Sequence, residues 1–141
     1  MNNFSYPKSL NIGLVGAGPW GRNYISTISK LSGINLTRLA SSNPDSANKV
    51  GPECVISEKW RDVVDSKALD GIVIASPPTT HAEIAIAAIN NGLAVLLEKP
   101  MTLSVQDSEK LLSIAQDKEA IVMVDHIHLY SPAWRAIRRE A

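Results

Sequence analysis

The sequence is poor in the features that mark secreted, membrane-spanning and nucleic-acid-binding proteins. Its 141 residues contain one cysteine, Cys54, which excludes an intrachain disulfide and a cysteine-rich zinc site. Fourteen Lys and Arg residues balance fourteen Asp and Glu residues, and this neutrality argues against non-specific binding to nucleic acid or to an anionic membrane. The apolar runs, such as residues 84–89, are far shorter than the about 18 residues that cross a bilayer. We therefore expect no membrane, nucleic-acid or metal partner.

The start and the length of the chain narrow the class further. The apolar stretch near the N-terminus is interrupted by Gly13, Gly16 and Gly18, unlike the continuous centre of a signal peptide. This pattern predicts a cytoplasmic protein. A chain of 141 residues suits one domain and is too short for two full ones.

Apolar, β-rich runs alternate with helical patterns along the chain. The runs occupy residues 10–15, 34–40, 72–75, 93–97 and 121–124, with a short strand also expected at 54–56. Helical patterns lie at residues 20–31, 81–91 and 104–118, and the last is predicted to place Val105, Leu111, Leu112 and Ala115 on its apolar face. Several runs are continuously apolar, which is typical of strands that helices cover on both faces. The sequence therefore predicts an α/β protein with a doubly wound parallel sheet.

The predicted organisation has three parts and no internal repeat. A polar arm spans residues 1–9, and the domain spans residues 10–130. The segment 131–141 is predicted to form a helix.

A glycine motif follows the first predicted strand directly and opens the first helix. Gly16 permits a tight turn, Gly18 lets the backbone approach a pyrophosphate, and Gly21 lets helix and strand pack closely. Pro19 and Trp20 occupy the first turn of the helix, whose free N–H groups and positive dipole end favour phosphate. We expect these residues to bind a dinucleotide. The alternative is a glycine-rich turn without a ligand.

The end of the second predicted strand lacks an acidic residue. In such units an Asp or Glu about 20 positions beyond the third glycine accepts hydrogen bonds from the adenosine ribose. Ser41 stands there, so no carboxylate repels a 2′-phosphate and no Arg beside it holds one. Arg38, inside the strand, is expected to be a strand residue and not a phosphate clamp. The cofactor is therefore NAD or NADP, with NADP predicted to bind at least as well as NAD.

Two further groups of polar residues follow buried strands. They are Ser76, Pro77, Pro78 and His81 in the first group, and Glu98, Lys99 and Pro100 in the second. Ligands of open α/β sheets bind at the carboxyl ends of the strands, so both groups are candidates for contact with a nicotinamide or a substrate hydroxyl. Each has a structural alternative: His81 in the first turn of its helix, and Glu98 with Lys99 as a solvated pair.

Taken together, these motifs resemble the N-terminal domain of the Gfo/Idh/MocA oxidoreductase family, which includes glucose–fructose oxidoreductase and inositol dehydrogenase. The resemblance is carried by residues 16–21, by 71–81 (GIVIASPPTTH), by 92–100 (GLAVLLEKP) and by 122–132 (VMVDHIHLYSP). It covers about residues 10–139. It implies a Rossmann fold that binds NAD or NADP, with the helix at 131–141 as the start of a link to a second domain.

The resemblance also implies roles for single residues. Lys99 matches the family's lysine beside the nicotinamide and the substrate, where it orients the reacting hydroxyl, and is therefore the expected catalytic residue. Expected at the cofactor site are Glu98 and Pro100 from the same motif and Pro77, Pro78 and His81 from the turn along the crevice. Residues 125–132 depart from the family's pattern, because Ile127, His128 and Leu129 stand where an Asn and an Arg are common. This departure puts substrate contacts from the segment in doubt.

The expected function is that of the NAD(P)-binding domain of an oxidoreductase. It would transfer hydride between a nicotinamide and a sugar-like secondary alcohol or ketone. The family's second domain supplies an Asp, a His and usually the dimer surface, so these 141 residues are expected to be catalytically incomplete and to form a homo-oligomer only with that domain. The alternatives are a non-enzymatic dinucleotide-binding module and a truncated fragment without independent activity.

Overall fold

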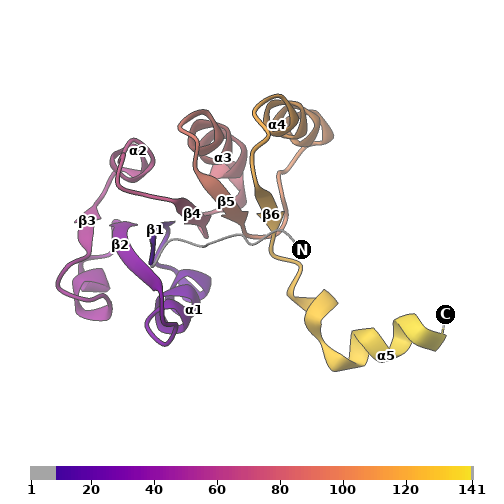
Figure 1. Ribbon diagram of the computed structural model, residues 1–141, viewed down its shortest axis with the longest axis horizontal. Helices are drawn as coiled ribbons and strands as arrows, with labels where there is room; N and C mark the ends of the chain where they lie inside the picture. Colours follow the sequence, from indigo (N-terminus) through magenta and orange to yellow (C-terminus); the bar gives the residue numbers. More distant parts are fainter. Residues whose placement is uncertain (1–8, 141) are drawn as a thin grey trace.

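Six parallel strands form one sheet in the order β3-β2-β1-β4-β5-β6 in the computed structural model, which describes residues 9–140 (Figure 1). The strands are β1 (Leu10–Val15), β2 (Ile34–Ala40), β3 (Val55–Ser57), β4 (Gly71–Ile74), β5 (Ala94–Leu97) and β6 (Val122–Val124). Every neighbouring pair is parallel. The strand order reverses between β1 and β4, and this is the point of such a sheet where ligands bind. The predicted fold class is confirmed.

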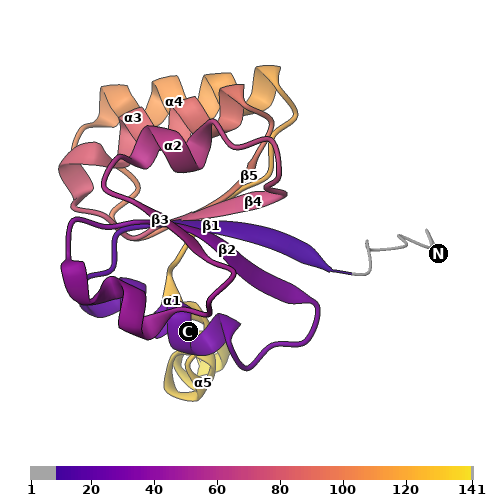
Figure 2. The same ribbon diagram turned by 90° about the vertical axis from the view of Figure 1, so that its left-hand side faces the viewer.

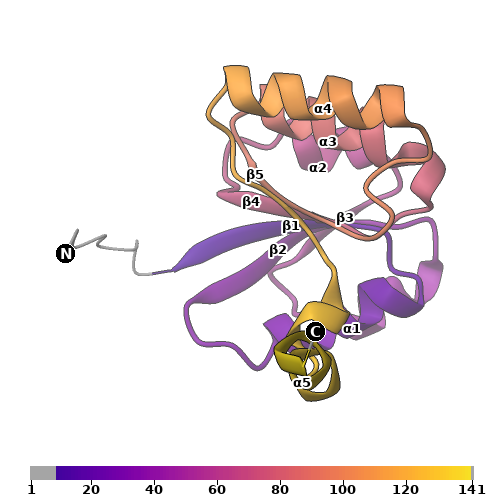
Figure 3. The same ribbon diagram turned by 90° about the vertical axis from the view of Figure 1, so that its right-hand side faces the viewer.

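Helices cover both faces of the sheet, as Figures 2 and 3 show: α2, α3 and α4 lie on one face and α1 on the other. The helices are α1 (Pro19–Ile28), α2 (Trp60–Val64), α3 (His81–Asn90), α4 (Val105–Asp117) and α5 (Pro132–Glu140), with 3₁₀ turns η1 (Pro44–Lys49), η2 (Pro78–Thr80) and η3 (Ile127–Tyr130). α5 projects beyond the β6 edge, away from the helices that cover the sheet (Figure 1). Among the described residues no helix has the length and apolarity needed to span a membrane.

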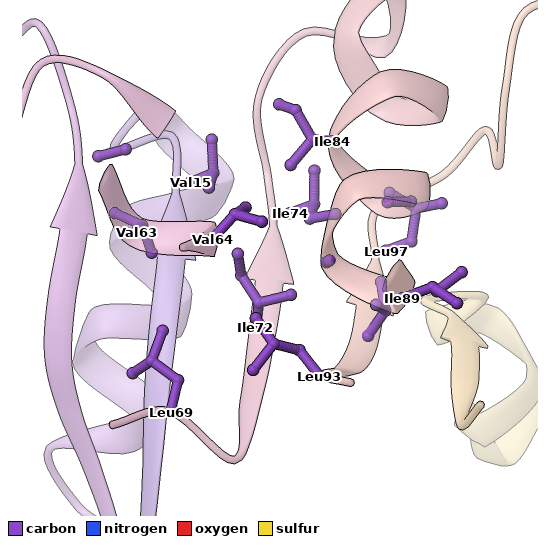
Figure 4. Packing of buried hydrophobic residues seen from close by; sticks show 14 of the residues in the cluster. Val15, Val63, Val64, Leu69, Ile72, Ile74, Ile84, Ile89, Leu93 and Leu97 are labelled. Atoms are coloured by element: carbon purple, nitrogen blue, oxygen red, sulfur yellow. The ribbon is translucent and has the colours of Figure 1, made fainter. Parts of the chain in front are cut away.

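The larger core lies between the sheet and the layer of α2, α3 and α4 (Figure 4). Its members include Val63, Val64, Ile72, Ile74, Ile84, Ile89, Leu97 and Leu111. A smaller core on the α1 side contains Leu14, Ile25, Leu39 and Val73. Successive residues of β4 therefore enter opposite cores, which explains why this strand is continuously apolar.

The observed elements agree closely with the predicted ones, with differences at their ends. β1 and β2 have the predicted bounds, whereas β3 lies one residue later and α1 ends at Ile28 and not at Leu31. The face predicted for α4 is wrong in part. Leu111 is buried, but Val105 and Leu112 are exposed, because α4 ends the row of helices on this face and has a helix neighbour, α3, on one side only (Figure 1).

The predicted terminal segments are described only in part. Of the N-terminal arm at residues 1–9, all but Ser9 lie outside the described residues, as does residue 141. α5 occupies most of the helix predicted at 131–141. The division into arm, domain and linking helix stays a prediction.

Candidate functional site

A cleft of about 510 Å³ opens at the carboxyl edge of the sheet, at the reversal of strand order. Its walls come from the segments that follow four strands. They include Gly16, Ala17, Gly18 and Pro19 after β1, Ser41, Ser42 and Asn43 after β2, Glu58 and Trp60 after β3, and Ala75, Ser76, Pro77 and Thr80 after β4. The structure thus joins the glycine motif, Ser41 and the turn after β4 in one site.

Two glycines of the motif are required by the fold itself. Gly16 has a φ of +97°, and a Cβ added there would lie 2.6 Å from the Ala75 carbonyl oxygen. A Cβ on Gly21 would lie 2.0 Å from the Gly16 carbonyl oxygen. A side chain at either position would collide with backbone, so these glycines hold β1, the turn and α1 in close contact.

Gly18 differs from both, because none of the described residues 9–140 occupies the space beside it. A Cβ added there would meet no atom within 4 Å, and its φ of −65° suits any residue. Gly18 is nevertheless part of the cleft wall and precedes the first turn of α1. That helix has no side-chain cap, so its first free N–H groups remain available to a ligand. A dinucleotide pyrophosphate fits this combination of open space and donors.

The end of β2 is held by hydrogen bonds within the chain. The Ser41 N–H donates to the Ser57 carbonyl at 2.9 Å, and the Ser46 hydroxyl donates to Ser41 Oγ at 2.8 Å. Arg38 donates through Nε to Ser66 Oγ at 2.8 Å and is not part of the cleft wall. This placement agrees with its expected role as a strand residue.

His81 is fully buried and does not line the cleft. Its Nδ1 lies 2.8 Å from the Pro100 carbonyl oxygen, and its Nε2 lies 3.0 Å from the Ser76 carbonyl oxygen. The imidazole therefore ties the turn after β4 to the loop after β5. Of the predicted residues in its turn, Ser76 and Pro77 line the cleft and Pro78 does not.

Glu98 is buried and belongs to a polar cluster that sequence reasoning missed. The Tyr24 phenol lies 3.0 Å from Glu98 Oε1 and also contacts Asp125 Oδ2, so three segments far apart in the chain meet here. Burial, followed by the hydrogen bonds to Asp125 and Glu98, raises the pKa of Tyr24 well above its usual value. The phenol therefore stays neutral and keeps the proton that it donates in hydrogen bonds to the carboxylates. No local motif pointed to this meeting, because it depends on packing between α1 and the ends of β5 and β6.

Lys99 lies at a second cavity of about 790 Å³ and is exposed. The other walls of this cavity include Asp125, His126, His128, Trp134 and Ile137. Trp20 and Pro100 line neither of the two cavities. The predicted site residues that line a cavity are therefore divided between the two, with Lys99 apart from the others, and the remaining predicted residues line neither. Asp125 belongs to both the Tyr24 cluster and the Lys99 cavity, which links them.

Comparison with known proteins gives a family match over most of the chain. The model of the Gfo/Idh/MocA group, described as "Oxidoreductase family, NAD-binding Rossmann fold", matches residues 10–126. The crystal structure of an oxidoreductase-like protein from Magnetospirillum magnetotacticum MS-1 is 47% identical, with a TM-score of 0.86, and the match covers 94% of this chain and 43% of that one.

Two curated relatives differ in what their names say they act on. Inositol 2-dehydrogenase 4 from Saccharopolyspora erythraea is 29% identical over 140 residues, which cover 94% of this chain and 40% of the relative. The 4-carboxy-2-hydroxymuconate-6-semialdehyde dehydrogenase from Sphingobium sp. is 25% identical over 134 residues, which cover 93% of this chain and 42% of the relative. The chain thus spans about two fifths of the length of these relatives.

Proposed function

This chain belongs to the Gfo/Idh/MocA family of NAD(P)-binding oxidoreductases, and from that membership we propose that it forms the cofactor-binding part of a sugar-type dehydrogenase. The observation that carries the proposal is the open space beside Gly18. Gly18 leaves open space in the cleft wall that no residue in the described part of the chain fills, directly before the uncapped start of α1. A pyrophosphate is the ligand that this backbone arrangement suits.

The residues present divide the work of holding the dinucleotide. Gly18 and the first turn of α1 would receive the pyrophosphate, and the segments after β2 and β3 would receive the adenosine end. Ser76 and Pro77, at the end of β4, would border the path toward the nicotinamide. His81 acts from behind this wall, because its two ring contacts hold the turn and the Pro100 loop together.

We assign Lys99 to the chemical step. A bound nicotinamide supplies the hydride acceptor or donor. Lys99 is exposed at the second cavity, where its ammonium group can donate a hydrogen bond to a substrate oxygen and protonate it when a ketone is reduced. In the direction of alcohol oxidation, its uncharged amine can accept the proton that the hydroxyl releases. Glu98 supports the loop from inside, since its carboxylate accepts from the Lys99 N–H at 3.2 Å and from the Tyr24 phenol. A sugar-like alcohol or ketone is the substrate class suggested by the inositol dehydrogenase among the relatives.

A second domain completes the site in this proposal, with α5 as the helix that leads to it. The outer wall of the Lys99 cavity comes from α5, and α5 is exposed along its whole described length. The same exposure favours the second candidate function, a dinucleotide-binding module without turnover of its own.

Calorimetric titration of the 141-residue chain with NADH and NADPH tests the proposal. The wild type should bind at least one of them, and Gly18→Val should weaken that binding by about 100-fold or more, because the added side chain occupies the space for the pyrophosphate. Gly51→Val is the matched control. An added Cβ also meets no atom within 4 Å at Gly51, but that residue lies outside the cleft. Equal affinity of the Gly18 variant and the wild type would refute the assignment.

A further inference from the structure

Glu58 is the only carboxylate among the described residues that line the cleft. It follows β3 directly, and β3 runs parallel to β2 with Ser57 opposite Ala40. The hydrogen bond from the Ser41 N–H to the Ser57 carbonyl keeps the two strand ends together, so Glu58 emerges beside Ser41. Glu58 also borders an adjoining hollow of about 460 Å³ whose walls include Ser41 and Ser42. The segment after β3 therefore supplies a carboxylate, Glu58, beside the end of β2, which has no acidic residue of its own.

Ser41 itself has no acceptor capacity left for a ligand. Its Oγ accepts a hydrogen bond from the Asn43 N–H at 3.1 Å and another from the Ser46 hydroxyl at 2.8 Å. A hydroxyl oxygen has two acceptor lone pairs, so only the Ser41 O–H remains, as a donor. Asn43 Oδ1 accepts one hydrogen bond, from the Asp45 N–H at 3.0 Å. Glu58 is the charged acceptor in this space for a proton that a ribose hydroxyl donates.

The described walls of the cleft and of the adjoining hollow place no cation against this carboxylate. Among residues 9–140, no Lys or Arg lines the cleft or the adjoining hollow, and Glu58 has no ion-pair partner. Two arginines in neighbouring segments are engaged elsewhere. Arg38 bonds to Ser66, and Arg61 pairs with Glu83 at 2.7 Å. A ribose 2′-phosphate, with a charge of about −1.5 to −2, would enter a space whose one charged wall is negative.

We infer that Glu58 makes this cleft select NAD over NADP, by accepting a hydrogen bond from the free ribose hydroxyl and repelling a phosphate at that position. This inference rests on the proposed function, because it requires the adenosine end of a dinucleotide to lie over β2 and β3. It reverses the preference expected from Ser41, since that expectation considered only the end of β2. The specificity carboxylate comes from the next strand.

The test compares the affinities of NADH and NADPH by isothermal titration calorimetry on the 141-residue chain. The wild type should bind NADH at least about tenfold more tightly, the scale of one charge-assisted contact. Glu58→Gln keeps the size of the side chain and removes its charge, so this preference should fall to about twofold or less. Glu53→Gln removes the same charge from an exposed residue outside the cleft and should leave the preference unchanged. Glu58→Arg should bind NADPH more tightly than NADH.

The outcomes separate the inference from the proposal beneath it. If the wild type binds both dinucleotides equally or prefers NADPH, Glu58 does not select NAD and the inference is wrong. It is also wrong if Glu58→Gln and Glu53→Gln keep the same preference as the wild type. If neither dinucleotide binds to the wild type, the proposed function itself fails and the inference falls with it. Circular dichroism of each variant checks that the exposed substitutions leave the fold intact.

Discussion

The cleft over β1 and the cavity beside Lys99 lie at the same edge of the sheet, but their walls are supported differently. The walls of the cleft belong to segments between β1 and α3, and Ile84 beneath them is 1% exposed. The cavity beside Lys99 takes its outer wall from η3 and α5, where Trp134 is 43% exposed and Ile137 is 59% exposed. The cleft is therefore supported by the buried core, whereas the outer wall of the Lys99 cavity consists of exposed side chains.

The difference shows which step of the proposed function each region can perform. Binding a dinucleotide needs fixed backbone donors and space, and the cleft has both, since Gly16 and Gly21 hold the turn rigidly. Positioning a substrate for proton and hydride transfer needs a closed, water-excluding site. In the proposed function, the Lys99 cavity would supply the group that transfers the proton and one wall of the substrate site. We therefore expect binding and turnover to be separable in this protein.

The largest expected effect is on the free energy of unfolding, and it compares the core beneath the cleft with the exposed helix α5 beside the Lys99 cavity. Ile84→Ala should lower the free energy of unfolding by about 3 kcal/mol, because it leaves a cavity in the core between α3 and the sheet. Ile137→Ala, which removes the same atoms from an exposed position, should cost less than about 0.5 kcal/mol. Urea unfolding followed by circular dichroism measures both. Similar losses in the two variants would mean that α5 is packed as firmly as the core.

The next effect separates binding from chemistry. In a chain that continues through the proposed second domain, Lys99→Ala should lower kcat by roughly 100-fold while changing dinucleotide affinity little. The 141 residues alone should show no steady-state dehydrogenase activity on inositols or aldoses. Steady-state kinetics and calorimetry on the same preparations test both statements. Robust turnover by the short chain, or an active Lys99→Ala enzyme, would show that the catalytic machinery lies elsewhere.

The smallest effect concerns Tyr24, which ties α1 to the Glu98 and Asp125 carboxylates. Its folded-state pKa is raised, mainly by burial, whereas a tyrosine in the unfolded chain ionises near about pH 10. The stability that the protonated Tyr24 phenol gives to the folded state is therefore complete below about pH 10. It is lost as the pH rises further, because the unfolded state then gives up the phenol proton while the folded state keeps it. At neutral pH, Tyr24→Phe should cost about 1 kcal/mol through the lost hydrogen bonds.

Unfolding curves from about pH 8 to about pH 11 measure this dependence. The wild type should lose stability more steeply than Tyr24→Phe above about pH 10, so that the difference between them shrinks. Parallel curves over the whole range would show that the phenol titrates alike in the folded and the unfolded states.

Local sequence chemistry determined the architecture and the first wall of the cleft. Continuous apolar runs such as that of β4 predicted strands covered on both faces, because helices pack on both faces of a parallel sheet. The glycine motif likewise predicted its own turn, since the need for Gly16 and Gly21 comes from backbone contacts within one strand–turn–helix unit. These features depend on residues close together in the chain, so they can be read without the fold.

Tertiary packing alone decided which polar side chains meet. The sequence pointed to His81 as a cleft residue, but the fold buries it between two loops. It contained no signal for Glu58 beside Ser41, because that proximity is set by the pairing of β2 with β3. The meeting of Tyr24 with Glu98 and Asp125 spans 74 and 101 positions of the chain. Local pattern carries no information over such separations, because the contacts exist only once strands and helices have packed against one another.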